Sequence, residues 1–218
     1  MTQQLLLLRH GEIESHRGDV PVTNAGLQTA TQVGRNLAAR AAGPIRVISG
    51  ETRRTRETAA AVARGARDAG AEVKEEGVAF ALRNPDLYLA GIRVDMVSSE
   101  AAFAAQVPEF EEADVAGIAF FNEWLHAPDR VGWWVAHQNP PGDDAATVAA
   151  RIRAFAASLA DSHNTGALIV GVTHSPVLRA CAVDAVGTDP GEPNWLAGLE
   201  YEVSRDRSLD IRLLPDAP

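Results

Sequence analysis

The chain has 218 residues, of which 46% are hydrophobic, enough for one medium-sized α/β domain or a core domain with an inserted cap. Its net charge of −9 argues against general nucleic-acid binding, because that function needs a basic surface. It does not exclude an anionic substrate, because a few local cations can bind one.

The cysteine content and the apolar run near the N-terminus indicate where in the cell the protein is expected. Cys181 is the only cysteine, so no intrachain disulfide can form, and we expect a cytoplasmic protein. Its surroundings, LRACAVDAV, predict a buried and inert thiol. The leucine run at 5–8 is too short to cross a bilayer, and it lacks the basic start and cleavage site of a signal peptide. We therefore expect no membrane partner.

The first third of the chain alternates short apolar runs with helical periodicity. Thr23 is a suitable N-cap for the first helix, and Gly43 lies just past its end. An uninterrupted apolar strand such as the first one is typical of a strand buried on both faces. The predicted strands are 4–9, 45–49 and a third extended segment, 71–82, and the predicted helices are 23–43 and 51–70.

Residues 92–142 interrupt this alternation. The segment is rich in Phe, Trp, Pro and Asp, and it predicts an inserted cap of helices and loops, rather than another sheet unit, that ends at the Pro-Pro-Gly of 140–142. Its aromatic side chains leave three alternatives open: cap packing on the core, a hydrophobic substrate pocket, or a homodimer interface. They are Phe120, Phe121, Trp124, Trp133 and Trp134.

The last third returns to regular elements. Residues 143–162 show helical periodicity, with Asp143 and Asp144 at the positive end of the helix. Ser175 and Pro176 predict the N-cap and first position of another helix. The remaining predicted strands are 167–173, 199–205 and 209–214.

This order predicts an α/β fold. We expect a three-layer sandwich with a mostly parallel central sheet flanked by helices, forming a single domain over 1–218 with the cap insertion at roughly 92–142. In such sheets, ligands bind at the carboxyl ends of the strands.

Three predicted strand ends carry side chains suited to phosphate chemistry. Arg9 and His10 end the first strand, Arg54 follows the second, and His174 ends the strand at 167–173. Two arginines can clamp a tetrahedral oxyanion through forked hydrogen bonds. One neutral imidazole can attack phosphorus, and a second, protonated, can stabilise the charge of the transition state. These groups predict a phosphoryl-transfer site that needs no metal or organic cofactor.

Four sequence motifs in this order carry a family resemblance. LLLLRHGE, PVTNAG, SGETRRTRETA and VTHSPVLRA resemble the histidine phosphatase superfamily, also called phosphoglycerate mutase-like, in its branch 1, since Ser175 rather than Asp follows His174. The matching residues are Arg9-His10-Gly11, Pro21-Val22-Thr23 with Gly26, Ser49 with Arg54, Thr58 and Ala59, and His174.

The resemblance implies roles for individual residues. His10 would be the nucleophile and carry a transient phosphohistidine, and Arg9, Arg54 and His174 would bind the phosphoryl group. Three further residues near the first motif are implied to contact the phosphate or orient the site: His16, Arg17 and Glu12.

The general acid departs from the family pattern. Relatives of this branch often carry Leu-x-Glu after the third strand, whereas this chain has Asn84 there, which has no titratable proton. We expect Asp86, two residues further on, to act as the acid, with Glu12 as a weaker alternative. His126, His137 and His163 show no metal-ligand spacing.

The function predicted is hydrolysis of a small-molecule phosphomonoester through a phosphohistidine. Two alternatives stay open. One is a phosphoglycerate mutase, although the chain has a single lysine, Lys74, and no evident mutase insertion. The other is a phosphate-ligand binding or regulatory module that has lost its acid, as Asn84 suggests.

Overall fold

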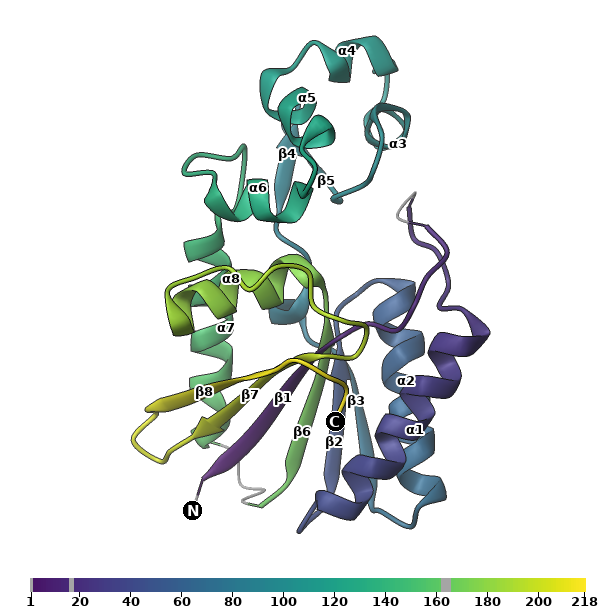
Figure 1. Cartoon of the computed structure of the whole chain (residues 1–218), viewed down its shortest axis with the longest axis vertical. Coiled ribbons are helices and arrows are strands. Elements are labelled where there is room, and N and C mark those ends of the chain that lie inside the picture. Colours follow the sequence, from purple (N-terminus) through teal and green to yellow (C-terminus); the bar gives the residue numbers. More distant parts are fainter. Residues whose placement is uncertain (1, 16–17, 162–165) are drawn as a thin grey trace.

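A six-stranded sheet forms the centre of the structure (Figure 1). The computed structural model describes residues 2–15, 18–161 and 166–218, without the side chains of Glu75 and Glu76. The strand order is β3-β2-β6-β1-β7-β8. Pairing is parallel from β3 to β1, and antiparallel between β1 and β7 and between β7 and β8. The strands are β1 Gln3–Arg9, β2 Ile45–Ser49, β3 Val73–Val78, β6 Leu168–Thr173, β7 Gly198–Val203 and β8 Leu209–Leu214.

Helices cover both faces of this sheet, as predicted. Helices α1 (Asn24–Arg40) and α2 (Arg53–Asp68) lie on one face, and α7 (Ala145–Ser158) and α8 (Ser175–Val186) lie on the other (Figure 1). The four leucines of β1 alternate between the two sides: Leu6 and Leu8 pack with the first pair of helices, and Leu5 and Leu7 with the second. An interior strand covered on both faces explains the unbroken apolar run.

The ends of two helices bear on the sequence predictions. Thr23 caps α1 as expected, because its hydroxyl accepts a hydrogen bond from the backbone N–H of Gly26 at 3.0 Å. The prediction that Ser175 is an N-cap is wrong. His174 has extended backbone angles (φ −123°, ψ 156°) and is the N-cap, so Ser175 is the first residue of α8 and Pro176 the second. The positive end of α8 therefore begins directly beside His174.

The third extended segment is shorter than predicted. Strand β3 ends at Val78, and residues Phe80–Leu82 form a short 3₁₀ turn, η1. This turn returns the chain to the sheet, where Leu82 is fully buried and its carbonyl accepts a hydrogen bond from the hydroxyl of Thr173 at 2.8 Å. Burial of Leu82 and this bond favour a turn over a longer strand.

The segment between β3 and α7 contains four short helices and one hairpin. The helices are α3 Glu100–Ala104, α4 Glu112–Ala116, α5 Ala119–His126 and α6 Arg130–Ala136. The hairpin of β4 (Leu87–Leu89) and β5 (Ile92–Val94) corrects the expectation of helices and loops alone. Its turn, Ala90-Gly91, has positive φ at both residues (50° and 78°), and Ala90 gives no sequence signal for such a turn.

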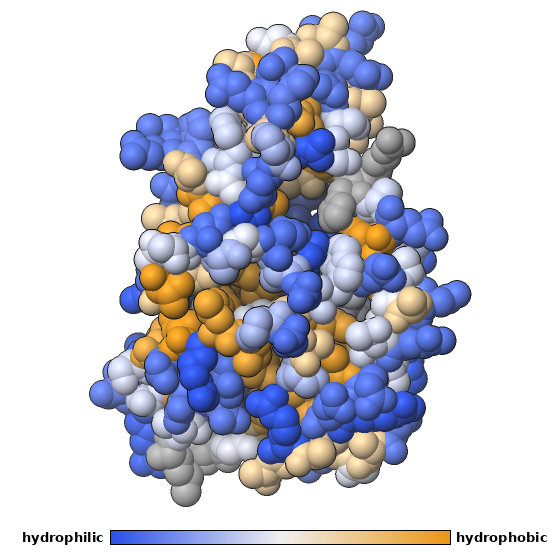
Figure 2. All heavy atoms as spheres, viewed as in Figure 1, coloured by the Kyte–Doolittle hydropathy of each residue, from blue (hydrophilic) through white to orange (hydrophobic). Residues whose placement is uncertain are grey.

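Aromatic side chains form the interior of this cap. Phe121, Trp124 and Trp134 are buried, and the rings of Phe103 and Phe121 lie 4.8 Å apart. The indole N–H of Trp134 donates to the carbonyl of Asp143 at 3.1 Å. In the view of Figure 2, the outer face of the cap is mostly hydrophilic. Packing inside the cap therefore accounts for most of these side chains.

Two further observations concern the thiol of Cys181 and the length and apolar character of the helices. Cys181 is buried as predicted, and burial raises the pKa of its thiol to about 12, so it stays protonated at neutral pH. Within the residues that the structure describes, no helix combines the length and the apolar character needed to cross a membrane.

Candidate active site

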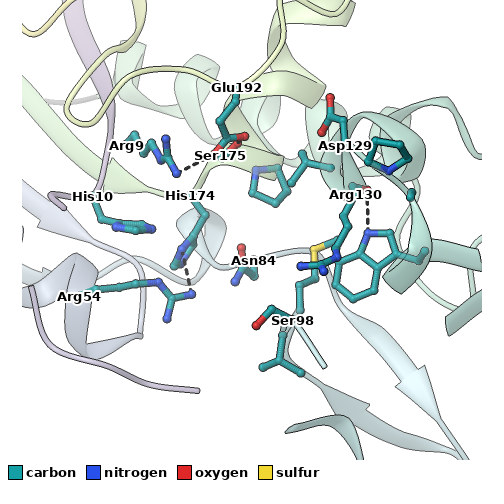
Figure 3. A pocket seen from close by; sticks show the side chains of 17 residues that line it. Arg9, His10, Arg54, Asn84, Ser98, Asp129, Arg130, His174, Ser175 and Glu192 are labelled. Carbon is teal, nitrogen blue, oxygen red and sulfur yellow. Dashed lines mark hydrogen bonds and ion pairs between the residues drawn. The ribbon is translucent and has the colours of Figure 1, made fainter. Parts of the chain in front are cut away.

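Three neighbouring parallel strands deliver the predicted site residues to one cavity. His10 follows β1, Arg54 lies in the first turn of α2 after β2, and His174 follows β6. The cavity has a volume of about 500 Å³, and it is lined by these residues on one side and by the cap on the other (Figure 3). The carboxyl edge of the sheet thus forms the floor of the site.

The ring of His10 has a defined orientation. Its Nδ1 lies 2.9 Å from the carbonyl oxygen of Gly11, and a carbonyl can only accept, so Nδ1 carries the proton. In the neutral imidazole, Nε2 then holds the lone pair. The rings of His10 and His174 lie 5.6 Å apart, and both residues are almost fully buried. A neutral imidazole in this tautomer is chemically capable of nucleophilic attack through Nε2.

Thr58 ties the His10 loop to Arg54. Its hydroxyl accepts a hydrogen bond from the backbone N–H of Gly11 at 2.9 Å and donates one to the carbonyl of Arg54 at 2.7 Å. Thr58, which belongs to the third motif, is thus a positioning residue that fixes the start of α2 against the end of β1. Burial lowers the pKa of Arg54. Among the carboxylates that oppose this shift, the charge of Asp19 has the largest effect.

His174 contacts Arg54 directly. Nη2 of Arg54 lies 3.4 Å from Nδ1 of His174. A guanidinium can only donate, so Nδ1 accepts and the imidazole is neutral, with its proton on Nε2. This differs from the expectation of a protonated second imidazole, although Nε2–H can still donate to a phosphoryl oxygen.

Arg9 is held from three directions by the loop between α8 and β7. Its guanidinium pairs with Glu192 at 2.6 Å, donates to the carbonyl of Pro193, and stacks over the indole of Trp195 at 3.6 Å. Burial lowers the pKa of Arg9, and Glu192 opposes this shift. Sequence reasoning missed Glu192 and Trp195, because this loop has no periodicity or motif that points to them.

Glu12 lies outside the cavity lining. Its carboxylate accepts from the hydroxyl of Thr23 at 2.9 Å, and its carbonyl accepts from the backbone N–H of Thr23 at 2.8 Å. Gly26 permits this close turn, since a Cβ there would lie 2.8 Å from the backbone N of Glu12. The structure therefore places Glu12 in the turn before α1 rather than on the phosphate.

Asn84 and Asp86 are placed differently. Asn84 is buried and lines the cavity, whereas Asp86 does not line it. The carboxylate of Asp86 pairs with Arg83 at 2.6 Å and with Arg93. Burial would raise its pKa, but the hydrogen bonds from Arg83 and Arg93 outweigh burial and hold the pKa at about 2. These contacts argue against the predicted role of Asp86 as general acid, because a carboxylic acid with this pKa is ionised at neutral pH.

The remaining histidines lie away from the cavity or outside the described residues. His126 is exposed, and His137 packs on Trp133 at 4.7 Å between ring centroids. His16, Arg17 and His163 lie outside the described residues, so the implied phosphate contacts of His16 and Arg17 stay predictions. Over 2–15, 18–161 and 166–218, no three His, Cys, Asp or Glu side chains form a metal-binding group.

The cap supplies an apolar wall and one further cation. Trp124 and Val131 line the cavity beside Arg130, whose Nε donates to the carbonyl of Leu125 at 3.1 Å. Figure 3 shows His10, Arg54 and His174 at one end of the cavity, Asn84 near the middle, and Arg130 at the other end. This arrangement separates a phosphate end from an end that can receive the rest of a substrate.

Arg179, on α8, joins the cap to this helix and to the loop that follows it. It is 2% exposed, and its guanidinium binds Asp129 of the cap at 2.6 and 2.8 Å, and also Asp189 of the loop that follows α8. Its Nη1 also lies 3.6 Å from Glu192. Burial opposes the charge, but the hydrogen bonds to Asp129 and Asp189 outweigh it and raise the pKa of Arg179. Nothing in the apolar context of α8 suggests this role from sequence.

Comparisons with known proteins agree with this geometry. The sequence profile of the histidine phosphatase superfamily (branch 1) matches residues 5–76 and 101–205. No curated protein sequence matches significantly. Solved structures with the same fold include YhfR from Bacillus stearothermophilus, with 22% identity, TM-score 0.64, and coverage of 99% of this chain and 98% of that one.

Two other solved structures illustrate the range of relatives. A mycobacterial glucosyl-3-phosphoglycerate phosphatase has 17% identity and TM-score 0.59, with coverage of 98% of this chain and 97% of that one. A phosphoglycerate mutase from Bacillus anthracis has 16% identity and TM-score 0.59, with coverage of 99% and 93%. The profile match extends over most of the sequence and includes His10, Arg54 and His174. The chain belongs to the histidine phosphatase superfamily, branch 1.

Proposed function

We propose that the protein is a phosphoric monoester hydrolase that acts on a small-molecule phosphate ester through a phosphohistidine at His10. The observation that carries this proposal is the convergence of His10, Arg54 and His174 on one cavity, with the lone pair of His10 at Nε2. No metal or organic cofactor is needed for these steps. The cytoplasmic location stays a prediction from the single cysteine.

Each residue of the site has its own role in phosphoryl transfer. Nε2 of His10 attacks phosphorus in line with the leaving oxygen. Arg54, Arg9 and Nε2–H of His174 bind the non-bridging oxygens, where negative charge develops. The first turn of α8, which begins beside His174, adds the positive end of a helix.

Hydrolysis rather than mutase transfer is supported by the other end of the cavity. Trp124, Val131 and Met96 make that wall largely apolar, with Arg130 as its cation. Transfer back to a phosphoglycerate would be expected to use more cations for a second charged group. Both a phosphatase and a mutase occur among the structural relatives, so the products of the reaction distinguish the two.

The test is hydrolysis of p-nitrophenyl phosphate by the wild type, His10→Ala and His126→Ala. His126 is the matched control, since it is exposed and outside the cavity. We expect the wild type and the control to release phosphate to water and His10→Ala to lose about 10³-fold or more in kcat, as expected for removal of a nucleophile. Retained turnover in His10→Ala would contradict the proposal. Phosphate binding without turnover in the wild type would favour a binding module.

A further inference from the structure

Departure of an alkoxide from phosphorus needs a proton, which a carboxylic acid commonly supplies. Two carboxylates line the cavity in the part of the chain that the structure describes, Asp129 and Glu192. Asp129 accepts two hydrogen bonds from Arg179, and these lower its pKa. Glu192 pairs with Arg9 at 2.6 Å. Both carboxylates are engaged as acceptors of arginine hydrogen bonds, so neither is suited to donate a proton.

Asp86 is fixed away from the cavity by its backbone as well as by its side chain. Its N–H donates to the carboxylate of Asp143 at 3.0 Å, and its carbonyl accepts from the N–H of Asp143 at 2.7 Å. Its carboxylate is held by Arg83 and Arg93. A swing of the side chain into the cavity would break its bonds to Arg83 and Arg93, and a shift of the backbone would break those to Asp143.

His174 is also a poor proton donor. With Nδ1 accepting from Arg54, the ring is neutral, and a neutral imidazole gives up its Nε2 proton only with great difficulty. Protonating Nδ1 would place a second positive charge beside the guanidinium at 3.4 Å. His174 is thus arranged to bind a phosphoryl oxygen rather than to protonate the leaving group.

Asn84 occupies the position between the phosphate end and the cap end (Figure 3). It is 3% exposed, and within the described residues its Oδ1 is buried without a hydrogen-bond partner. The segment before it is fixed, because Arg151 donates to the carbonyls of Ala81 at 3.2 Å and Arg83 at 2.8 Å. Oδ1 can only accept, so a hydrogen bond from Asn84 to the leaving oxygen has to come from its NH₂ group, on a side chain that lines the cavity. Its NH₂ is a donor without an exchangeable acidic proton.

We propose that Asn84 donates a hydrogen bond to the leaving oxygen, and that the substrates are phosphates whose leaving group is stable as an anion. Aryl, enol and acyl phosphates have this chemistry. This inference rests on the proposed function and names its substrate class. A simple alkyl ester is then a poor substrate, because its alkoxide leaves without a proton.

The reaction balances without a general acid. The lone pair on Nε2 of His10 forms the N–P bond, and the P–O bond breaks with its electron pair left on the departing oxygen, which leaves as an anion hydrogen-bonded to Asn84. Water then attacks phosphorus, and the N–P bond breaks with its pair returned to Nε2. Both protons of the water stay on the product, dihydrogen phosphate, so neutral His10 is regenerated.

The first experiment measures kcat/KM of the wild-type enzyme for aryl phosphates of graded leaving-group basicity, for acetyl phosphate, and for glycerol 3-phosphate. This parameter reports steps up to the departure of the leaving group. We expect it to fall steeply with leaving-group basicity, with glycerol 3-phosphate at least about 10³-fold below p-nitrophenyl phosphate, since general acids contribute about 10²–10⁴-fold.

Variants of Asn84 test its own contribution. Asn84→Asp places a carboxyl group at the same position. We expect its kcat/KM for glycerol 3-phosphate to rise about tenfold or more, and its kcat/KM to depend less steeply on leaving-group basicity. Asn84→Ala removes the donor, and we expect a steeper dependence and a loss of about 10-fold or more on aryl esters. Asn139→Asp, on an exposed residue outside the cavity, should match the wild type.

The outcomes separate the two proposals. Similar wild-type kcat/KM for glycerol 3-phosphate and p-nitrophenyl phosphate would overturn the inference and leave the proposed function standing. An unchanged leaving-group dependence in Asn84→Ala would overturn the role of Asn84, even if Asn84→Asp fails to fold. No turnover of any substrate and no phosphoenzyme would contradict the proposed function itself.

Discussion

The backbone N–H of Gly11 donates to the hydroxyl of Thr58, with 2.9 Å between N and Oγ1, so the loop of His10 is bound to the helix that carries Arg54. Thr58 is buried, and the same hydroxyl donates to the carbonyl of Arg54. His10 and Arg54, the proposed nucleophile and phosphate clamp, are therefore positioned by one side chain that does not line the cavity.

Thr58→Val keeps the shape of the side chain and removes the hydroxyl. The buried N–H of Gly11 then loses its acceptor, so we expect about 1–3 kcal/mol less stability in urea unfolding. We also expect kcat to fall about tenfold, because small misplacement of catalytic groups is costly. Thr58→Ser keeps the hydroxyl and should restore kcat. Equal activity of the Val and Ser variants would show that the hydrogen bond does not position the site.

Asp86→Asn tests whether Asp86 supplies ion pairs or a proton. The folded-state pKa of about 2 lies below the ordinary value of about 3.9, so this carboxylate stabilises the fold above pH ~4 and loses that contribution as pH falls toward 2. We expect Asp86→Asn to lower stability by about 1–2 kcal/mol at pH 7, after allowance for partial exposure, and by less at pH 3.

Activity gives the second readout for Asp86→Asn. The leaving-group dependence of kcat/KM should match that of the wild type, because Asp86 does not line the cavity. Asp210→Asn, on an exposed residue of β8, is the matched control for stability. A steeper leaving-group dependence in Asp86→Asn alone would restore Asp86 as the acid.

Much of the site could be predicted because its members adjoin regular elements. His10 and His174 each follow an apolar strand, and Arg54 lies in the first turn of the helix after β2, so topology alone brings them together. Alternation of strands and helices likewise predicted the layers of the sheet. The contacts of Asp86 could not be predicted, because Arg93 reaches it from the β4-β5 hairpin, and Ala90 in the turn of this hairpin gives no sequence signal for positive φ.

Side-chain contacts made by loop residues could not be predicted from the sequence either. Glu192 and Trp195 reach Arg9 from the loop after α8, where no periodicity fixes which side chains turn inward. Ser175 was predicted as a helix cap from its residue type, but the extended backbone of His174 moves the cap back by one residue. In each case tertiary contacts decide what local propensity leaves open.

Arg179→Met removes the guanidinium that links the cap to α8 and to the loop after it, and it leaves Asp129 and Asp189 without that partner. Because Arg179 is buried while its partners are partly exposed, we expect a loss of about 2–3 kcal/mol, measured by urea unfolding. Arg153→Met breaks an exposed pair with Asp184 and should cost less than about 0.5 kcal/mol. Equal losses in the two variants would contradict this assignment.

Arg130→Met tests the cation at the cap end of the cavity. We expect KM for 4-carboxyphenyl phosphate to rise about tenfold while KM for phenyl phosphate changes little, because only the first substrate carries a carboxylate on its leaving group for Arg130 to bind. Arg205→Met, on an exposed residue outside the cavity, is the matched control. A uniform rise in KM for both substrates would mean that Arg130 shapes the cavity without selecting charge.

The most direct test of the account is to trap the phosphoenzyme. Rapid quench of the wild type with an aryl phosphate, followed by peptide mapping under alkaline conditions, locates the phosphoryl group. We expect an acid-labile phosphate on His10, formed as fast as the first burst of phenol and absent in His10→Ala. A phosphate on another residue, or steady turnover with no phosphoenzyme at any time, would contradict it.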